Sequence, residues 1–320
     1  MSIRTLLATA AIIALPGAAL AQMTPTMSST ITLGFSSTSL DALGADIDLN
    51  TTSIDVASDI AFGPNVNVAL DFGIAMTEID TPLPIGIDAD LMSFAFEPSY
   101  HFANGAYVGA YYRMGDLDIS ISLLPITLGV DTHQSGIFAG YESGPFWVEV
   151  FFGTSDSDPG IGGIDITDYG LAASYDVMPN LEVFGSYTRT NIDLGGADID
   201  LSLYAIGADY DFGNGLSVYG SVGRFDVGLP IPVSIDATQF SMGLSYDLAQ
   251  AGGGFPGVVG LEVSRTNADL GPISADATSF GLSLTIPLGN NASTTALNSH
   301  SQVARGQYRS AISGGLASLR

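Results

Sequence analysis

Residues 239–248 read Gln-Phe-Ser-Met-Gly-Leu-Ser-Tyr-Asp-Leu, and this stretch decides the fold. Large apolar side chains occupy every even position from Phe240 to Leu248, and small or polar side chains occupy the odd positions. Successive side chains of a β-strand point to opposite faces, so this alternation predicts a strand with one apolar and one polar face. The same period of two runs from about residue 28 to residue 288.

The alternating stretches recur as hairpins. One frame of alternating residues can be superposed seven times, with starting points 34 to 41 residues apart, at Asn50, Asp90, Asp131, Asp165, Asp200, Asp236 and Asp276. Turn signals such as Gly63-Pro64-Asn65 and Gly213-Asn214-Gly215 separate the strands. Each repeat therefore holds two strands, and the sequence predicts about 14 strands in seven hairpin repeats.

The two faces indicate what the strands build. The polar face is mostly Ser, Gly, Ala, Thr and Asp, which are too small and polar to fill the dry core of a soluble sandwich. An apolar outer face and a polar interior are typical of a transmembrane antiparallel up-and-down β-barrel. Five tyrosines recur at one height on the apolar face, as an interfacial aromatic girdle should: Tyr100, Tyr141, Tyr175, Tyr210 and Tyr246.

Composition narrows the classes further. The chain has 320 residues, with 33 acidic and 8 basic residues, all arginine, and a formal net charge of −25. Nucleic acid is excluded as a partner because its phosphates would be repelled. A disulfide or thiolate-metal scaffold is excluded because there is no cysteine.

The chain divides into three regions. Residues 1–21 predict a signal peptide, with Arg4 before an apolar core and Ala19-Leu20-Ala21 as a cleavage site. Residues 22–288 are the predicted barrel. Residues 289–320 form a polar, basic tail that we expect in the periplasm.

The signal peptide, the tyrosine girdle, the even strand count and alternating short and long connections resemble the outer-membrane β-barrels of Gram-negative bacteria, and specifically porins. The resemblance covers about 260 residues and rests on pattern rather than on a motif. It implies an integral protein of the bacterial outer membrane, in contact with lipid and lipopolysaccharide, with short turns on the periplasmic side. Whether the barrel is a monomer or a homo-oligomer stays open.

In porins the third external loop narrows the channel. By that resemblance Asp116, Asp118 and Asp131 are candidates for a constriction. The alternative is a somewhat longer external hairpin, because residues 119–127 are mostly apolar.

The polar face carries most of the predicted function. Acidic residues on that face are expected to line the lumen: Asp59, Asp71, Glu142, Glu149, Asp176, Glu182, Asp209, Asp211, Asp247 and Glu262. Water must solvate so many carboxylates, and a lumen of one charge sign concentrates the opposite ion. We therefore expect a passive diffusion pore for small hydrophilic solutes that prefers cations. The alternative is a structural or adhesive barrel that conducts nothing or is plugged by its tail.

The arginines of the barrel share a position at the ends of strands. Arg113, Arg189, Arg224 and Arg265 are expected to face outward at the upper membrane boundary. There they can pair with lipopolysaccharide phosphates or with neighbouring aspartates.

No cofactor and no dedicated metal site are predicted. The external loops share an Asp–tip–Asp form, such as Asp193 to Asp198, which could hold Ca²⁺ or Mg²⁺ only loosely. His101, His133 and His300 have no convincing serine and acid partners, so we expect no enzyme.

The tail is the remaining open point. It contains no acid and holds Arg305, Arg309 and Arg320, so its charge is opposite to that of the predicted lumen mouth. It is expected either to extend into the periplasm or to dock on the acidic ring as a plug. Conductance after deletion of residues 290–320 separates these alternatives.

Overall fold

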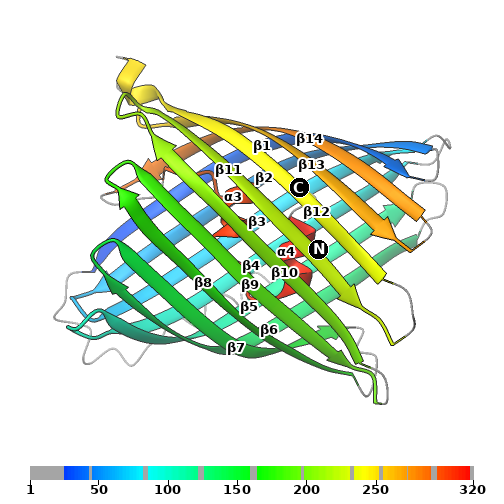
Figure 1. Ribbon diagram of the computed structural model, residues 1–320, viewed down its shortest axis with the longest axis horizontal. Helices are drawn as coiled ribbons and strands as arrows, with labels where there is room; N and C mark the ends of the chain where they lie inside the picture. The colour runs from blue at the N-terminus through cyan, green and yellow to red at the C-terminus, as the bar shows by residue number, and fades with distance from the viewer. Residues whose placement is uncertain are drawn as a thin grey trace.

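The alternating stretches form strands that each pair with the next, and the first pairs with the last, so the sheet closes in the computed structural model (Figure 1). The structure describes residues 25–42, 45–81, 86–121, 126–158, 164–195, 198–230, 234–251, 255–271, 273–289 and 294–317. The predicted signal peptide lies outside these residues. The prediction of an antiparallel up-and-down barrel of 14 strands is confirmed.

The strands are 13 to 18 residues long. Their bounds are β1 Thr26–Ala42, β2 Ala45–Phe62, β3 Val66–Asp80, β4 Ile87–His101, β5 Ala106–Ile121, β6 Ile126–Ser143, β7 Phe146–Asp158, β8 Asp165–Met178, β9 Leu181–Asp193, β10 Asp198–Asp211, β11 Leu216–Gly228, β12 Ser234–Asp247, β13 Val258–Leu270 and β14 Ile273–Leu288. A short 3₁₀ helix, η1 Leu248–Ala251, follows β12, and two helices, α3 His300–Ala304 and α4 Ala311–Ala317, follow β14. No helix among the described residues is long and apolar enough to cross a membrane.

The two faces of the sheet differ as the alternation predicts. Large apolar side chains on the outer face are widely exposed, with Ile206 at 66% and Phe280 at 63%. Each girdle tyrosine pairs with the first residue of an adjacent strand, as Tyr100 does with Val66 and Tyr141 with Ala106. The five tyrosines therefore lie at one height, next to the turns at the end of the barrel where β14 stops. We call this end the tail end and the opposite end the loop end.

The predicted alternation of short and long connections is wrong. Residues 43–44 alone separate β1 from β2, and residues 271–272 separate β13 from β14, both at the loop end. The longest connection, residues 248–257, lies at the tail end. The strands include the aspartate-rich segments at the loop end. Asp41 pairs with Asp46 and Asp226 with Asp236 in the backbone ladder, with their side chains on the outer face.

The proposed constriction is also wrong. Asp116 pairs with Asp131 across β5 and β6, and Asp118 pairs with Gly129, so all three aspartates lie in a regular hairpin. Asp116 and Asp118 lie an even number of residues from the exposed Tyr112 on β5, so they share its face, which is the outer one. Asp131 is paired with Asp116 and faces the same way. In the described part of this hairpin the backbone stays in the paired ladder and does not fold into the lumen, in agreement with the alternative of a longer external hairpin.

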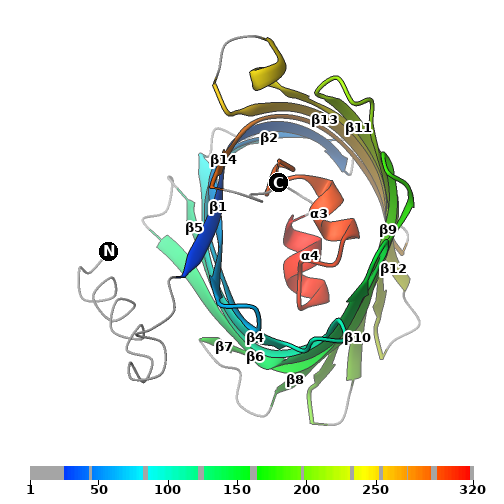
Figure 2. The same ribbon diagram turned by 90° about the vertical axis from the view of Figure 1, so that its left-hand side faces the viewer.

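The helices of the C-terminal segment, defined here as residues 294–317, lie inside the barrel (Figure 2). α3 contacts β9, β10 and β11, and α4 contacts β9 and β10. The expectation of a tail extended into the periplasm is therefore replaced by a segment that turns back into the lumen.

Candidate functional site: the acidic lumen and its C-terminal segment

Strand parity places the predicted lumen acids on the inner face. The acids that face the C-terminal segment directly are Glu149, Glu182, Asp209 and Glu262. Asp71 lines a smaller cavity beside Arg113. The remaining five lie next to the tail-end turns: Asp59, Glu142, Asp176, Asp211 and Asp247. Asp211 and Asp247 also cap turns, because each accepts a backbone N–H from two residues further on.

Local sequence signals give the segment its shape. The Ser299 hydroxyl accepts the backbone N–H of Ser301 and caps α3. α3 ends in a Schellman motif, in which Gly306 N–H donates to Val303 O and Gln307 N–H donates to Gln302 O. Gly306 has a φ of +77°, which a residue with a side chain rarely adopts. The chain thus reverses between α3 and α4 within the lumen.

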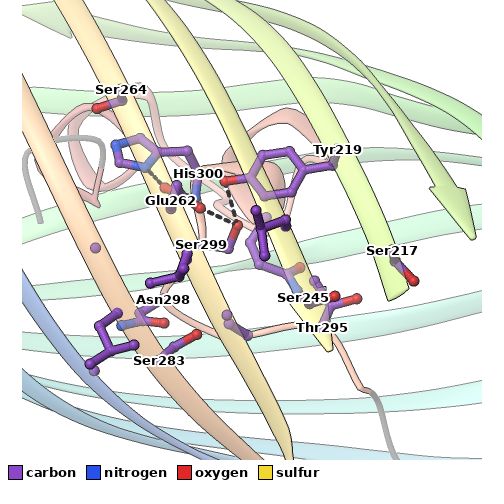
Figure 3. A pocket seen from close by; sticks show the side chains of 18 of the residues that line it. Ser217, Tyr219, Ser245, Glu262, Ser264, Ser283, Thr295, Asn298, Ser299 and His300 are labelled. Carbon is purple, nitrogen blue, oxygen red and sulfur yellow. Dashed lines mark hydrogen bonds and ion pairs between the residues drawn. The ribbon is translucent and has the colours of Figure 1, made fainter. Parts of the chain in front are cut away.

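The first anchor of the segment is at Glu262 (Figure 3). Ser299 Oγ donates to Glu262 Oε2 at 2.7 Å and lies 3.0 Å from the Tyr219 hydroxyl. The His300 backbone N–H donates to Glu262 Oε1 at 3.2 Å, and the His300 ring contacts the same oxygen through Nδ1. One lumen carboxylate therefore fixes the start of α3.

The second anchor is at Arg305. Its Nη1 donates to Glu182 at 2.6 Å, and its Nη2 lies 3.4 Å from Asp209. The guanidinium also lies over the Phe184 ring, 4.1 Å from the centroid. These side chains are about one-quarter exposed, so water weakens this anchor.

The third anchor, at Arg309, is the most buried. The Arg309 side chain is 7% exposed. Its Nη2 donates to Glu97 Oε2 at 2.9 Å, and its Nη1 contacts Glu149 Oε1. Three rings surround the guanidinium, those of Tyr111, Phe138 and Phe151.

An apolar patch on the lumen face supports the segment. Leu203 packs with Val303, Ala311 and Ala317, and Leu201 and Phe225 extend this cluster. Beside it, Thr190 accepts the backbone N–H of Ala311 at 2.9 Å and in turn contacts the buried Asp168. The helix start at Ser310 is therefore held by polar groups of β8 and β9 as well as by apolar packing.

Arg113 is a correction to the sequence prediction. It faces the lumen, where its Nε and Nη2 donate to Glu97 Oε1 at 2.8 and 2.6 Å. The other three arginines lie on the outer face at the loop end and pair with neighbouring aspartates. These pairs are Arg189 with Asp200, Arg224 with Asp226, and Arg265 with Asp276.

Cavities remain between the segment and the strands, and two of them differ in size and lining. The larger, of about 420 Å³, lies between the segment and the strands at the barrel closure, and Ser, Thr and acidic side chains line it, including Glu182, Asp211 and Glu262. The smaller, of about 150 Å³, lies on the side of β2 to β6 and includes Asp71 and Arg113. The larger cavity is lined by polar side chains, and the smaller combines Asp71 and Arg113 with apolar side chains such as Leu297.

The arrangement of Ser299, Glu262 and His300 differs from a catalytic triad. Ser299 donates to the carboxylate, and the carboxylate also contacts His300, so the acid stands between the other two. In a triad the histidine accepts the serine proton directly. His133 stacks on Tyr112 on the outer face, and His101 stacks on Tyr107. Within the described residues no group of three or more His, Asp or Glu is arranged to hold a metal ion.

Gly306 provides a test of segment docking. A Cβ at this position would lie 2.5 Å from Ala172 Cβ, in addition to the unfavourable φ. We expect Gly306→Val to destabilise the docked state by roughly 2 kcal/mol or more. Trypsin should then cleave after Arg305 and Arg309 at least about tenfold faster than in the wild type, since about 1.4 kcal/mol changes an equilibrium constant tenfold.

The matched control is Gly315→Ala in the same segment, where a new Cβ would make only an ordinary contact with Phe225 at 3.4 Å. Cleavage of this variant should match that of the wild type. Equal cleavage of Gly306→Val and wild type would show that Gly306 does not set the docking of the segment.

Comparison with known proteins shows which family this barrel resembles. The family model described as Gram-negative porin matches residues 87–228, which run from the start of β4 to the end of β11. Over these residues the chain is similar to Gram-negative porins, and the closed antiparallel barrel agrees with that similarity.

Two solved structures show the same fold as this porin-like barrel. The anion-selective porin from Comamonas acidovorans has 12% identity and a TM-score of 0.52, and the match covers 83% of this chain and 100% of that chain. The CymD monoaromatic hydrocarbon channel has 15% identity and a TM-score of 0.51, covering 87% and 94%. No curated protein sequence matches the chain.

Sequence reasoning missed two aromatic residues of the site, Tyr111 and Phe138. They lie on the inner face with Phe151, beside Glu97. One signal was available, because apolar residues such as Leu201, Leu203 and Phe225 interrupt an otherwise small and polar face. An apolar patch inside a wet lumen implies that something covers it.

Proposed function

We propose that this barrel is an outer-membrane channel for passive diffusion of small hydrophilic solutes, that it prefers cations, and that its C-terminal segment narrows the passage. The observation that carries the proposal is the charge of the inner face. Among the described residues, its carboxylates outnumber the guanidinium groups that face them, which are those of Arg113, Arg305 and Arg309. A wet lumen of one charge sign concentrates ions of the opposite sign.

The fold by itself does not set the sign of selectivity, because a similar structure is described as an anion-selective porin. Ion preference must therefore come from the lining residues. In this chain the acids next to the tail-end turns, including Asp59 and Glu142, are exposed and stay available to passing ions. With the tail end toward the periplasm, they form an acidic mouth on that side.

The test is the reversal potential of single channels in a planar bilayer under a KCl gradient. We expect a potential of the sign given by potassium permeating faster than chloride. Replacing Asp59 and Glu142 by Asn and Gln should reduce it, because two lumen charges are lost. The matched control replaces Asp226 and Asp236 by Asn, since these face outward at the loop end, and should leave the potential unchanged. A chloride-preferring potential in the wild type would overturn the proposal.

A plugged, non-conducting barrel is the second candidate, and the docked segment favours it. The same recordings separate the two functions. Silence in both the full-length protein and the protein lacking residues 290–320 would support a structural barrel. Silence of the full-length protein with conduction by the shortened one would support a plugged barrel, and conduction by the full-length protein supports the channel.

A further inference from the structure

The side chains around Arg309 form a compact group that we call the cation box: Glu97, Tyr111, Phe138, Glu149 and Phe151. They come from four consecutive strands, β4 to β7. The Arg309 guanidinium carbon lies 5.0 to 5.5 Å from the centroids of the three rings. Its two Nη atoms contact one carboxylate each. The box therefore surrounds a flat cation with ring faces and two anionic oxygens.

The box is built by the barrel and not by the segment. Each ring fits over a glycine of a neighbouring strand. A Cβ at Gly136 would lie 2.6 Å from Tyr111, and side chains at Gly109 and Gly170 would overlap Phe138 and Phe151. These glycines fix where the rings lie whether or not the segment is docked.

The carboxylates are also held in place by strand residues. Arg113 donates twice to Glu97 Oε1 and leaves Oε2 for the occupant of the box. The Tyr107 hydroxyl donates to Glu149 Oε2 at 3.0 Å and leaves Oε1 for the occupant. Glu97 Oε2 and Glu149 Oε1 are thus both oriented toward the position of the Arg309 guanidinium.

Charge and chemistry define what fits. With Glu97 neutralised in part by Arg113, the box as a whole needs one further positive charge. Ring faces attract cations, and planar guanidinium groups combine stacking on rings with hydrogen bonds to carboxylates. A small metal ion has neither a flat face to stack on the rings nor N–H groups to donate to the carboxylates, whereas a flat organic cation uses all five side chains.

We propose that the cation box is a binding site for solutes that carry a guanidinium or a similar flat organic cation, and that Arg309 occupies it as an internal competitor. This inference rests on the proposed channel function, of which it names the solute class. Binding of a solute and docking of the segment exclude each other, so each weakens the other by the same factor. A solute of this class loosens the segment when it enters the lumen.

Trp147 provides a local signal for the test. It is the single tryptophan of the chain and packs against the ring cluster of the box. The experiment titrates full-length protein with methylguanidinium at constant ionic strength and records Trp147 fluorescence. We expect Arg309→Ala, in which the box is empty, to respond with saturation. Its apparent Kd should be at least about tenfold lower than that of the wild type, since the competing arginine is gone.

Three controls make the result specific. Arg305→Ala removes an anchor of the segment that water already weakens but leaves Arg309 in the box, so its apparent Kd should lie closer to that of the wild type than to that of Arg309→Ala. Arg309→Ala with Glu149→Gln should lose the response, while circular dichroism confirms that the barrel is intact. Methylurea, which is flat but uncharged, and sodium ions should give no saturating response with Arg309→Ala.

Absence of saturation in Arg309→Ala, or an equal response to sodium, would overturn the cation box as a binding site. Because fluorescence does not require conduction, this outcome is independent of the reversal potential. A cation-preferring potential without methylguanidinium binding would leave the channel function standing and remove this inference. Methylguanidinium binding without cation preference would keep the cation box as a binding site and remove the proposed cation preference of the channel.

Discussion

Removal of residues 290–320 is expected to raise the single-channel conductance several-fold and to strengthen the preference for cations. The described part of this region lies inside the barrel and separates two cavities of about 420 and 150 Å³. Its loss joins them into one aqueous lumen. The same deletion removes Arg305 and Arg309, so their carboxylate partners on the strands face permeating ions.

The barrel should survive this deletion. Its closure depends on the pairing of β1 with β14, which continues from Ser29–Leu288 to Ala42–Ala275 without the segment. Glu97 keeps Arg113 as a partner, so Arg113 is not left as an unpaired charge. Reversal potential and conductance measured on the same channels check both parts. Unchanged conductance after the deletion would show that the segment does not narrow the passage.

The strand pattern was predictable because it is a local property. In residues such as Phe240 to Leu248 the lipid selects one face and water the other, so the period of two is written directly in the sequence. The ends of the strands were not predictable in this way. Aspartates usually terminate strands, but Asp41 pairs with both Asp46 and Asp276 in the continuing ladder, with side chains turned to the outside.

The face of Arg113 shows where parity fails. β5 carries aromatic residues on both faces, with Tyr111 buried in the lumen and Tyr112 exposed outside. The polarity of the β5 side chains therefore does not distinguish the lumen face from the outer face. A shift of one residue moves every side chain to the opposite face. The decisive observation is the contact between Arg113 and Glu97, which depends on the pairing of β4 with β5.

The position of the C-terminal segment inside the barrel could not be predicted from the sequence, because it also depends on how the strands pair. Opposite charges indicated attraction between the tail and the lumen, but not which acids would be used. Arg309 contacts residues of β4 and β7, and His300 contacts β13, on the far side of the closed sheet. Only closure of the barrel brings these partners to one place.

The second large effect is expected from Glu97→Gln, because this carboxylate pairs with the buried Arg309 and the partly buried Arg113. Its Oε1 accepts from Arg113, and its Oε2 accepts from Arg309. Removing one partner of a buried pair costs about 3–5 kcal/mol, since the remaining charge stays unsolvated. We expect the free energy of unfolding to fall by about this amount, and trypsin to cleave the released segment.

Glu149→Gln is the matched comparison, because Glu149 pairs with Arg309 alone among the arginines of the described chain. Both variants should release the segment in the full-length protein. In the protein lacking residues 290–320, Glu97→Gln should still lower the free energy of unfolding through Arg113, whereas Glu149→Gln should not. Adding Arg113→Gln to Glu97→Gln should then restore stability, since no buried charge is left unpaired. Equal stability of the two single variants in the shortened protein would contradict the shared role of Glu97.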